Sequence, residues 1–151
     1  QIRLGASGKI ISGFDVMRTL ALGADWCNSA RGFMFALGCI QAQTCHTGNC
    51  PTGVTTQDPH RQVALVVPTK SDRVRNFHLQ TLESVREMLQ ATGLASPSEL
   101  SLRHIMRRLS EHEIQNLADL MPSVNEGALL EGQLPEGVFS KYWHLASSER
   151  F

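Results

Sequence analysis

The sequence lacks a net charge, a long apolar run and a motif of closely paired cysteines. Its 151 residues carry 14 Lys and Arg against 14 Asp and Glu, which gives no electrostatic reason to expect nucleic acid or an anionic membrane as a partner. The longest apolar run, residues 33–40, is too short to span a bilayer, and no secretory signal pattern opens the chain. With 42% hydrophobic and 19% charged residues, we expect a globular, cytoplasmic protein with no nucleic-acid or membrane partner.

The residues that are present are unevenly spread. All four cysteines and eight of the twelve glycines lie within residues 1–53. Residues 1–68 carry five basic and three acidic side chains, a net charge of +2, whereas residues 69–151 carry nine and eleven, a net charge of −2. We therefore expect two parts: residues 1–68, built from turns and thiols, and residues 69–151, a mainly helical segment that packs on the first part.

The first 38 residues alternate between strand and helix patterns. Ser12 and Asp15 have the spacing of a capping box, which predicts where the first helix begins. The expected elements are, in order, a strand at 2–6, a helix from 12 to 23, a strand at 26–29 and a helix at 33–37. Such a βαβα run indicates an α/β protein with a parallel sheet.

The rest of the chain predicts a long loop followed by helices. Residues 38–61 have no periodicity and are expected to form a loop, and 62–67 fit either a strand or a buried extended segment. Apolar spacing predicts a helix over 71–90, with His78 on its buried stripe. Start signals at Ser96-Pro97 and at Ser110 predict two more helices, reaching residues 109 and 121, before an irregular end at 123–151.

The loop holds the strongest chemical signal, which is three thiols within twelve residues. Cys39, Cys45 and Cys50 are followed by Pro51, and thiolates so placed bind zinc or an iron–sulfur cluster. Three protein thiolates suit a three-iron cluster, or a four-iron cluster with an outside ligand. Three alternatives remain: a disulfide with one free thiol, a zinc site completed by His46, and buried cysteines without ligands. Cys27 is expected in the core, as a small residue of a strand.

Two turns have the composition of an anion site. The first turn combines Ser7-Gly8-Lys9 with Ser12-Gly13, and the second is Ser29-Ala30-Arg31-Gly32. Each precedes an expected helix, whose first amides can bind a phosphate. Because both turns follow parallel strands, we expect them to lie side by side, as do the phosphate-binding turns of (β/α)8 barrels. Tight turns with an ordinary helix cap are the alternative interpretation.

Longer segments resemble a known family. The segments 6–16 and 21–25 resemble the region of strand seven and helix seven in FMN-dependent (β/α)8 oxidoreductases. The segments Leu37-Gly38-Cys39-Ile40, Cys45-His46-Thr47, Cys50-Pro51 with Gly53-Val54, and Thr56-Gln57-Asp58-Pro59 resemble the iron–sulfur loop of the FMN-binding glutamate synthase family. The segment 71–93 and an expected helix around Arg107-Arg108 are similar to the C-terminal tail of shorter members of that family.

This resemblance implies a fold and two cofactors. The fold is the C-terminal portion of a (β/α)8 TIM barrel, strands 7 and 8 with their helices, followed by a mainly helical tail. A whole barrel needs about 250 residues, so the chain is expected to be part of a larger domain. The implied cofactors are FMN and a [3Fe-4S] cluster. The implied FMN phosphate site comprises Ser7, Gly8, Lys9, Ser12, Gly13, Ala30, Arg31 and Gly32, and the implied cluster ligands are Cys39, Cys45 and Cys50.

The resemblance also implies a reaction, namely the reductive synthesis of glutamate from 2-oxoglutarate and ammonia. In the family, electrons pass from ferredoxin or an NADPH-oxidising subunit through clusters to FMN, which reduces 2-iminoglutarate. The implied partners are that electron donor, the 2-oxo acid and the rest of the barrel. No residue here matches a general acid or a substrate clamp, so the catalytic residues stay unknown. The alternative function is a non-catalytic iron–sulfur or zinc module, acting as an electron carrier or scaffold.

Overall fold

A computed structural model describes residues 2–121, 123–134 and 136–149, and it divides the chain into two compact units, residues 1–101 and residues 102–151. The first unit begins with strand β1 (Gly5–Ser7), helix α1 (Gly13–Ala21), strand β2 (Trp26–Asn28) and helix α2 (Arg31–Leu37). This order confirms the predicted βαβα run. β1 and β2 pair in parallel, with Gly5 opposite Trp26 and Ser7 opposite Asn28, and within the described residues they form a sheet of their own.

Helix α1 begins where the capping box predicts. The backbone amide of Asp15 donates to Ser12 Oγ over 3.2 Å, and the amide of Ser12 donates to Asp15 Oδ2 over 2.9 Å. The bond from the Ser12 amide above all, with those from the Ser12 hydroxyl and the Ile11 amide, holds the pKa of the Asp15 carboxyl below its ordinary value. The cap satisfies amides that have no partner inside the helix, and it fixes the first residue of α1.

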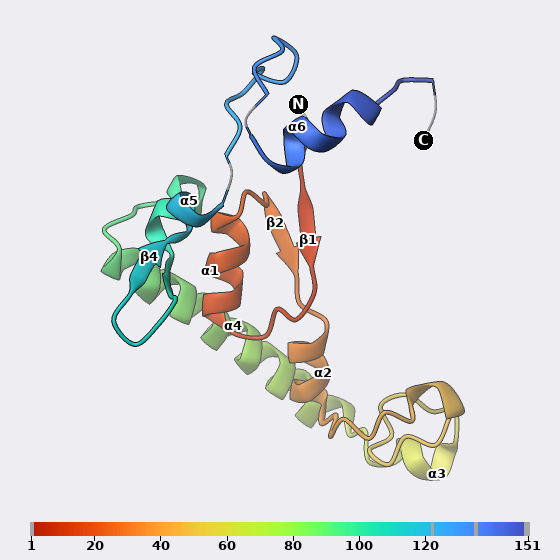
Figure 1. The fold of residues 1–151 in the computed structure, drawn as a ribbon. Coiled ribbons are helices and arrows are strands. Elements are labelled where there is room, and N and C mark those ends of the chain that lie inside the picture. Colours follow the sequence, from red (N-terminus) through yellow and green to blue (C-terminus); the bar gives the residue numbers. More distant parts are fainter. Residues whose placement is uncertain (1, 122, 135, 150–151) are drawn as a thin grey trace. The chain divides into compact units, whose positions relative to one another are not determined.

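The long helix α4 (Val67–Ala91) provides the core of the first unit. It begins four residues before the predicted start, with Pro68 in its first turn, where a proline is tolerated because the first amides need no helical partner. The core joins Met17 of α1 to Val85 and Leu89 of α4. Figure 1 shows α4 running behind both α1 and α2. His78, predicted to be buried, is instead exposed, with its ring centroid 5.9 Å from that of Phe33.

Between α2 and α4 the chain forms the cysteine loop, residues 38–58, which contains the short 3-10 helix η1 (Cys45–Thr47) and is followed by helix α3 (Pro59–Gln62). The segment 62–67, predicted as either a strand or a buried extended segment, is neither: Gln62 ends α3, residues 63–66 form a turn and a short connection, and Val67 begins α4. Helix α3 was not predicted, although Asp58-Pro59 is a start signal: the Asp58 side chain accepts a hydrogen bond from the His60 amide over 2.9 Å.

The predicted helices after residue 96 are largely wrong. Ser96 caps only a 3-10 turn, η2 (Pro97–Glu99), which closes the first unit. The second unit contains η3 (Leu102–His104) and an antiparallel pair of strands, β3 (Met106–Arg108) and β4 (Ile114–Asn116), where helices were expected. It continues with α5 (Leu117–Leu120), α6 (Val138–Tyr142) and η4 (Trp143–Leu145). The segment around Arg107-Arg108 is therefore a strand.

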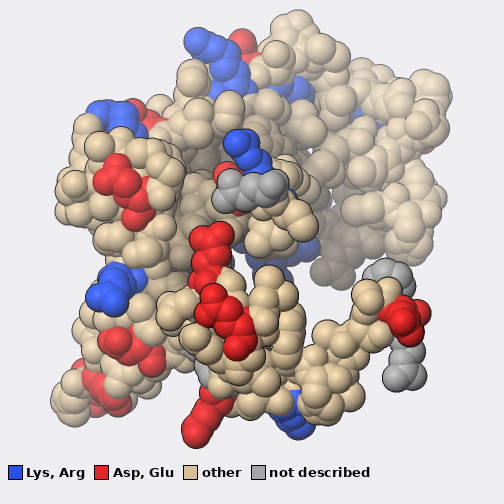
Figure 2. All heavy atoms as spheres, turned by 90° about the horizontal axis from the view of Figure 1, so that it is seen from above, with Lys and Arg blue, Asp and Glu red and all other residues tan. Residues whose placement is uncertain are grey.

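The described residues contain no helix with both the length and the apolarity needed to cross a membrane. On the face drawn in Figure 2, basic and acidic side chains are scattered singly or in small groups among uncharged residues. This distribution agrees with the equal numbers of positive and negative side chains in the sequence.

Met17 offers a direct test of the α1–α4 core, because its side chain is only 3% exposed. Replacing Met17 with Ala removes buried methylene and sulfur atoms and leaves a cavity, so we expect Met17→Ala to lower the free energy of unfolding by about 2–5 kcal/mol. Met106→Ala is the matched control, because Met106 is 58% exposed and the same truncation leaves no cavity. Denaturant unfolding of both variants measures the difference, and equal losses would contradict this description of the core.

Candidate functional site

The two predicted anion turns lie side by side at the end of the sheet. Because β1 and β2 are parallel and in register up to Ser7 and Asn28, their following turns leave the same edge. Ser29 Oγ donates a hydrogen bond to the carbonyl oxygen of Ile10 over 2.6 Å, which ties the second turn to the first. The structure thus brings together the two segments that the sequence singled out.

The first turn is exposed and its backbone is left-handed. Gly8 has a φ of 125° and Lys9 a φ of 55°, so the chain reverses sharply here before reaching α1. Ser12 is already occupied, because its amide and its hydroxyl both donate to Asp15 Oδ2, at 2.9 Å and 2.8 Å. In this turn, Ser7, Gly8 and Lys9 therefore remain the groups most accessible to an anion.

The second turn leads into α2 with less internal capping. Ala30 stands at the N-cap position, where its methyl side chain cannot accept a hydrogen bond, and the first turn of α2 contains no acidic residue. Arg31, the first residue of the helix, is exposed. This turn offers a cationic side chain beside backbone amides without a carboxylate cap.

Two of the three glycines of these turns, Gly13 and Gly32, have a structural role of their own. A Cβ on Gly13 would lie 2.8 Å from Ser84 Oγ, and a Cβ on Gly32 would lie 2.6 Å from Phe77 Cζ. Both contacts are closer than van der Waals packing allows, so glycine at each position lets α1 and α2 approach α4. Packing alone therefore explains why Gly13 and Gly32 are glycines, whatever binds at the turns.

Cys39, Cys45 and Cys50 face one enclosed space, which we call the thiol hollow. It is narrow, with a volume of about 10 Å³, and its wall includes all three cysteines together with Thr52 and Thr55. The structure therefore brings the three predicted ligands of the loop together. All four cysteines of the chain lie among the described residues and are free thiols, which contradicts the disulfide alternative.

The three cysteines have different surroundings. Cys50 is buried, Cys39 is half-buried and accepts a hydrogen bond from the Gln41 amide over 3.4 Å, and Cys45 is exposed at the start of η1. Hydrogen bonds from Thr52 and Thr55 lower the pKa of the Cys50 thiol from 9.0 to about 6, and the largest contribution is that of the Thr52 hydroxyl, 3.5 Å from Cys50 Sγ. Cys50 is therefore poised to be a thiolate at neutral pH.

Zinc and an iron–sulfur cluster place different demands on this loop. A single zinc ion needs its ligands around one point, and the described residues contain no group of three His, Cys, Asp or Glu side chains that could hold one metal ion. His46 is exposed in η1 and does not line the thiol hollow. In a multi-iron cluster each thiolate binds a different iron, so the sulfur atoms need not converge on one point.

Left-handed residues and helix α3 hold the loop in place. Gln41 and Gln43 have φ values of 58° and 57°, which are uncommon for residues with a side chain. Gly53 has a φ of 77°, and a Cβ there would lie 2.3 Å from the carbonyl oxygen of Arg61 in α3. Gln62 Nε2 donates to the carbonyl oxygen of Thr56 over 2.8 Å. Helix α3 thus supports the part of the loop that carries Cys50.

A second space, which we call the bridging hollow, joins the second turn to the cysteine loop. Its volume is about 320 Å³. Ala30 and Arg31 line it from the turn, and Cys39 and Cys45 line it from the loop. One open space therefore contacts both a predicted phosphate-binding turn and two predicted cluster ligands.

Cys27 lies apart from this arrangement. It is a residue of β2, and burial raises the pKa of its thiol, opposite to the shift at Cys50. It lines a different hollow, of about 160 Å³, together with Phe33 and Phe77. Cys27 is half-buried, so it is less enclosed than the core position that the sequence predicts.

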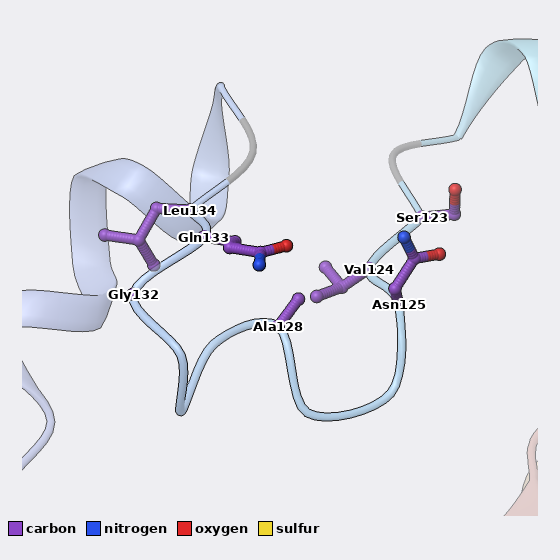
Figure 3. A pocket seen from close by; sticks show the side chains of 7 residues that line it. All are labelled: Ser123, Val124, Asn125, Ala128, Gly132, Gln133 and Leu134. Carbon is purple, nitrogen blue, oxygen red and sulfur yellow. The ribbon is translucent and has the colours of Figure 1, made fainter.

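A further hollow lies in the second unit and carries no obvious chemistry. Its volume is about 460 Å³. Figure 3 shows the seven residues that line it, which are Ser123, Val124, Asn125, Ala128, Gly132, Gln133 and Leu134. None of these side chains titrates near neutral pH, so size alone does not make this hollow a reaction site.

Sequence reasoning missed the groups that surround Cys50. Thr52 and Thr55 line the thiol hollow, and Arg61 donates a hydrogen bond from its guanidinium to the carbonyl oxygen of Asn49 over 3.4 Å. The signal was the density of threonine directly after Cys50, because hydroxyls in a loop seek local acceptors. Spacing alone does not reveal that two of these threonines turn toward the sulfur.

Comparison with known proteins gives consistent similarities. Residues 1–95 match the model of the conserved region in glutamate synthase. The glutamate synthase large subunit-like protein YerD of Bacillus subtilis (strain 168) is 41% identical over 121 residues, which cover 80% of this chain and 23% of that protein. The large chain of NADPH glutamate synthase from Azospirillum brasilense is 33% identical over 117 residues, covering 74% of this chain and 8% of that protein.

A relative whose name gives a different electron donor is similar to about the same degree. The ferredoxin-dependent glutamate synthase of Antithamnion sp. is 32% identical over 130 residues, covering 83% of this chain and 8% of that protein. The chain thus spans less than a quarter of the length of each of these relatives.

The surroundings of Cys50 predict a measurable pH dependence. In the metal-free chain, thiolate absorbance in the ultraviolet should rise with a transition near pH 6, which Cys50→Ser removes. Thr52→Val takes away a donor that stabilises the thiolate, so this transition should move up toward the ordinary pKa of 9.0. Thr47→Val is the control, because Thr47 bonds to Thr44 and Asn49 instead. An unchanged transition in Thr52→Val would refute the assigned cause.

Proposed function

The chain belongs to the glutamate synthase family, and from this premise we propose that it forms the cofactor-holding end of an FMN and iron–sulfur oxidoreductase. The full-length protein would carry out the reductive synthesis of glutamate from 2-oxoglutarate and ammonia. The observation that supports this proposal best is the bridging hollow, because Arg31 lines it from one side and Cys39 and Cys45 from the other.

In this proposal the two βα units are the last two of a (β/α)8 barrel. The parallel pairing of β1 and β2 with α1 between them is the repeating unit of such a barrel, and their turns leave the same edge. Leu4 and Trp26 expose large apolar surfaces on or beside these strands. Neighbouring strands from the rest of the barrel would cover these surfaces. The rest of that domain would therefore be a partner of this chain.

Cys39, Cys45 and Cys50 would hold a [3Fe-4S] cluster. The fit is supported by the donor set, which is three free thiols facing one space with Cys50 already biased toward the thiolate. Thiolates are the form that binds iron, and their loop is held by α3 and by left-handed residues. When bound, the cluster supplies one-electron transfer and FMN supplies hydride transfer.

Arg31, Lys9 and the exposed parts of the two turns would hold the FMN phosphate. Arg31 offers a planar cationic group beside the uncapped amides of α2, and Lys9 lies in the neighbouring turn. Ser7, Gly8 and Ala30 would add backbone amides, whereas Ser12 already partners Asp15, and Gly13 and Gly32 are packed against α4. These residues would bind and orient the cofactor, and they take no part in proton transfer.

The electron donor would be ferredoxin or an NADPH-oxidising subunit. Relatives of both kinds resemble this chain to a similar degree. The alternative of a non-catalytic zinc module receives no support from the geometry, because the described residues lack a group that could hold one metal ion.

The cysteines provide the first test of this proposal. In the full-length protein purified without oxygen, we expect iron, labile sulfide and visible absorbance from a cluster, and Cys45→Ser should lose all three because it removes one anchoring thiolate. Cys27→Ser is the matched control and should keep them, because Cys27 lines a separate hollow. One zinc per chain without iron, or full iron content in Cys45→Ser, would contradict the ligand assignment.

Arg31 provides the second test. Removing one charged donor to a phosphate costs about 1.5–3 kcal/mol, so Arg31→Gln in the full-length protein should raise the Kd for FMN about tenfold or more. The control is Arg75→Gln, on an exposed position of α4. It gives the protein the same net charge as Arg31→Gln and should leave the Kd for FMN unchanged. The two constants can be measured by flavin fluorescence on titration of the flavin-free protein. An equal change of the Kd in both variants would contradict the proposal that Arg31 binds the phosphate.

A further inference from the structure

Thr55 carries a hydroxyl that its own surroundings do not fully satisfy. Thr55 Oγ1 is buried, and among the described residues it makes no hydrogen bond of acceptable distance and angle. This hydroxyl helps to lower the pKa of the Cys50 thiol, but its contact with the sulfur does not have the geometry of a hydrogen bond. Thr55 also lines the thiol hollow together with the three cysteines.

Burying such a hydroxyl costs stability unless another group accepts a hydrogen bond from it. A buried polar group without a partner costs about 1–3 kcal/mol. The residues on either side of Thr55 pack on α3: a Cβ on Gly53 would lie 2.3 Å from the carbonyl oxygen of Arg61, and the carbonyl oxygen of Thr56 accepts a hydrogen bond from Gln62. The chain therefore holds an unsatisfied donor at the wall of a space surrounded by thiols.

We propose that Thr55 is a positioning residue that donates its hydroxyl hydrogen bond to sulfur at the cysteine site and thereby raises the reduction potential of the cluster held there. This inference rests on the proposed function, since it needs the cluster. A hydrogen bond to sulfur stabilises the reduced form more than the oxidised form, because one-electron reduction adds negative charge to the iron and sulfur atoms. Donors around cluster sulfurs are one of the means by which proteins set such potentials.

Thr52 does not duplicate this role. Its hydroxyl already lies 3.5 Å from Cys50 Sγ, so its partner is the protein's own sulfur. Thr55 is the threonine of this wall whose hydroxyl is buried and still without a full partner in the described structure. The Thr52 hydroxyl is thus paired with Cys50 Sγ, whereas the Thr55 hydroxyl, which only assists in lowering the pKa of Cys50, is available to what the thiolates bind.

The test is a redox titration of the full-length protein, followed by electron paramagnetic resonance of the oxidised three-iron cluster. The titrant donates one electron per cluster. We expect Thr55→Val, which keeps the branched shape but removes the hydroxyl, to shift the ratio of oxidised to reduced cluster about tenfold toward the oxidised form at a fixed potential. For a one-electron couple this corresponds to a midpoint about 59 mV lower. Thr55→Ser keeps a hydroxyl, so its midpoint potential should lie close to that of the wild-type protein.

Thr47→Val is the control within the same loop. Its hydroxyl bonds to Thr44 and Asn49 and does not line the thiol hollow, so its loss should leave the midpoint unchanged. An unchanged midpoint in Thr55→Val overturns the inference, as does an equal shift in Thr55→Ser or Thr47→Val. If Thr55→Val holds no cluster, retention in Thr55→Ser supports the hydroxyl and loss in both overturns it. A wild-type protein without iron refutes the proposed function itself, whereas a normal cluster with unshifted variants refutes only the role of Thr55.

Discussion

The packing of α4 across α1 and α2 is the contact on which the first unit depends. Two three-residue strands cannot stabilise themselves, because a sheet so small buries little apolar surface. The buried side chains come instead from the helices, with Met17 of α1 set against Val85 and Leu89 of α4. Gly13 and Gly32 permit this close approach, since a side chain at either position would collide with α4. The long helix therefore fixes where each of the two turns begins.

The site follows from that constraint. Once α1 and α2 are held on α4, the turns preceding them lie at one edge of the sheet, tied by the bond from Ser29 to Ile10. The cysteine loop leaves the end of α2 and leads through α3 to the start of α4, so the same packing also fixes both ends of this connection. Between these ends, Gly53 and α3 set the conformation of the part that bears Cys50. Cofactor chemistry would thus depend on a helix that itself contributes no predicted ligand.

The sequence predicts this part well because local and long-range signals agree there. The Ser12–Asp15 capping box is followed by an amphipathic helix whose apolar face has α4 to pack on. The same spacing at Ser110 and Glu113 fails, because the amides of Leu109 and Ser110 both bond to the carbonyl oxygen of Glu113 and close a hairpin turn. Of the apolar residues expected on that helix, Leu117 is buried but Ile114 and Met121 are exposed, so the apparent helical stripe had no continuous face to bury. A capping pattern specifies a helix only when packing completes it.

In the candidate site, the spacing of the cysteines predicts where they lie but not the pKa values of their thiols. Three cysteines in twelve residues predict a shared space, and they line one. Their chemical states do not follow from spacing. Cys50 has a lowered thiol pKa because threonines donate to it, whereas Cys27, the same residue type, has a raised thiol pKa because its partial burial in β2 disfavours the charged form. A cysteine in the sequence is therefore a possible ligand, and the hydrogen-bond donors around it determine whether its thiol is a thiolate that can bind a metal. In this chain those donors are hydroxyls that carry no motif of their own, so they become visible only once the loop is folded.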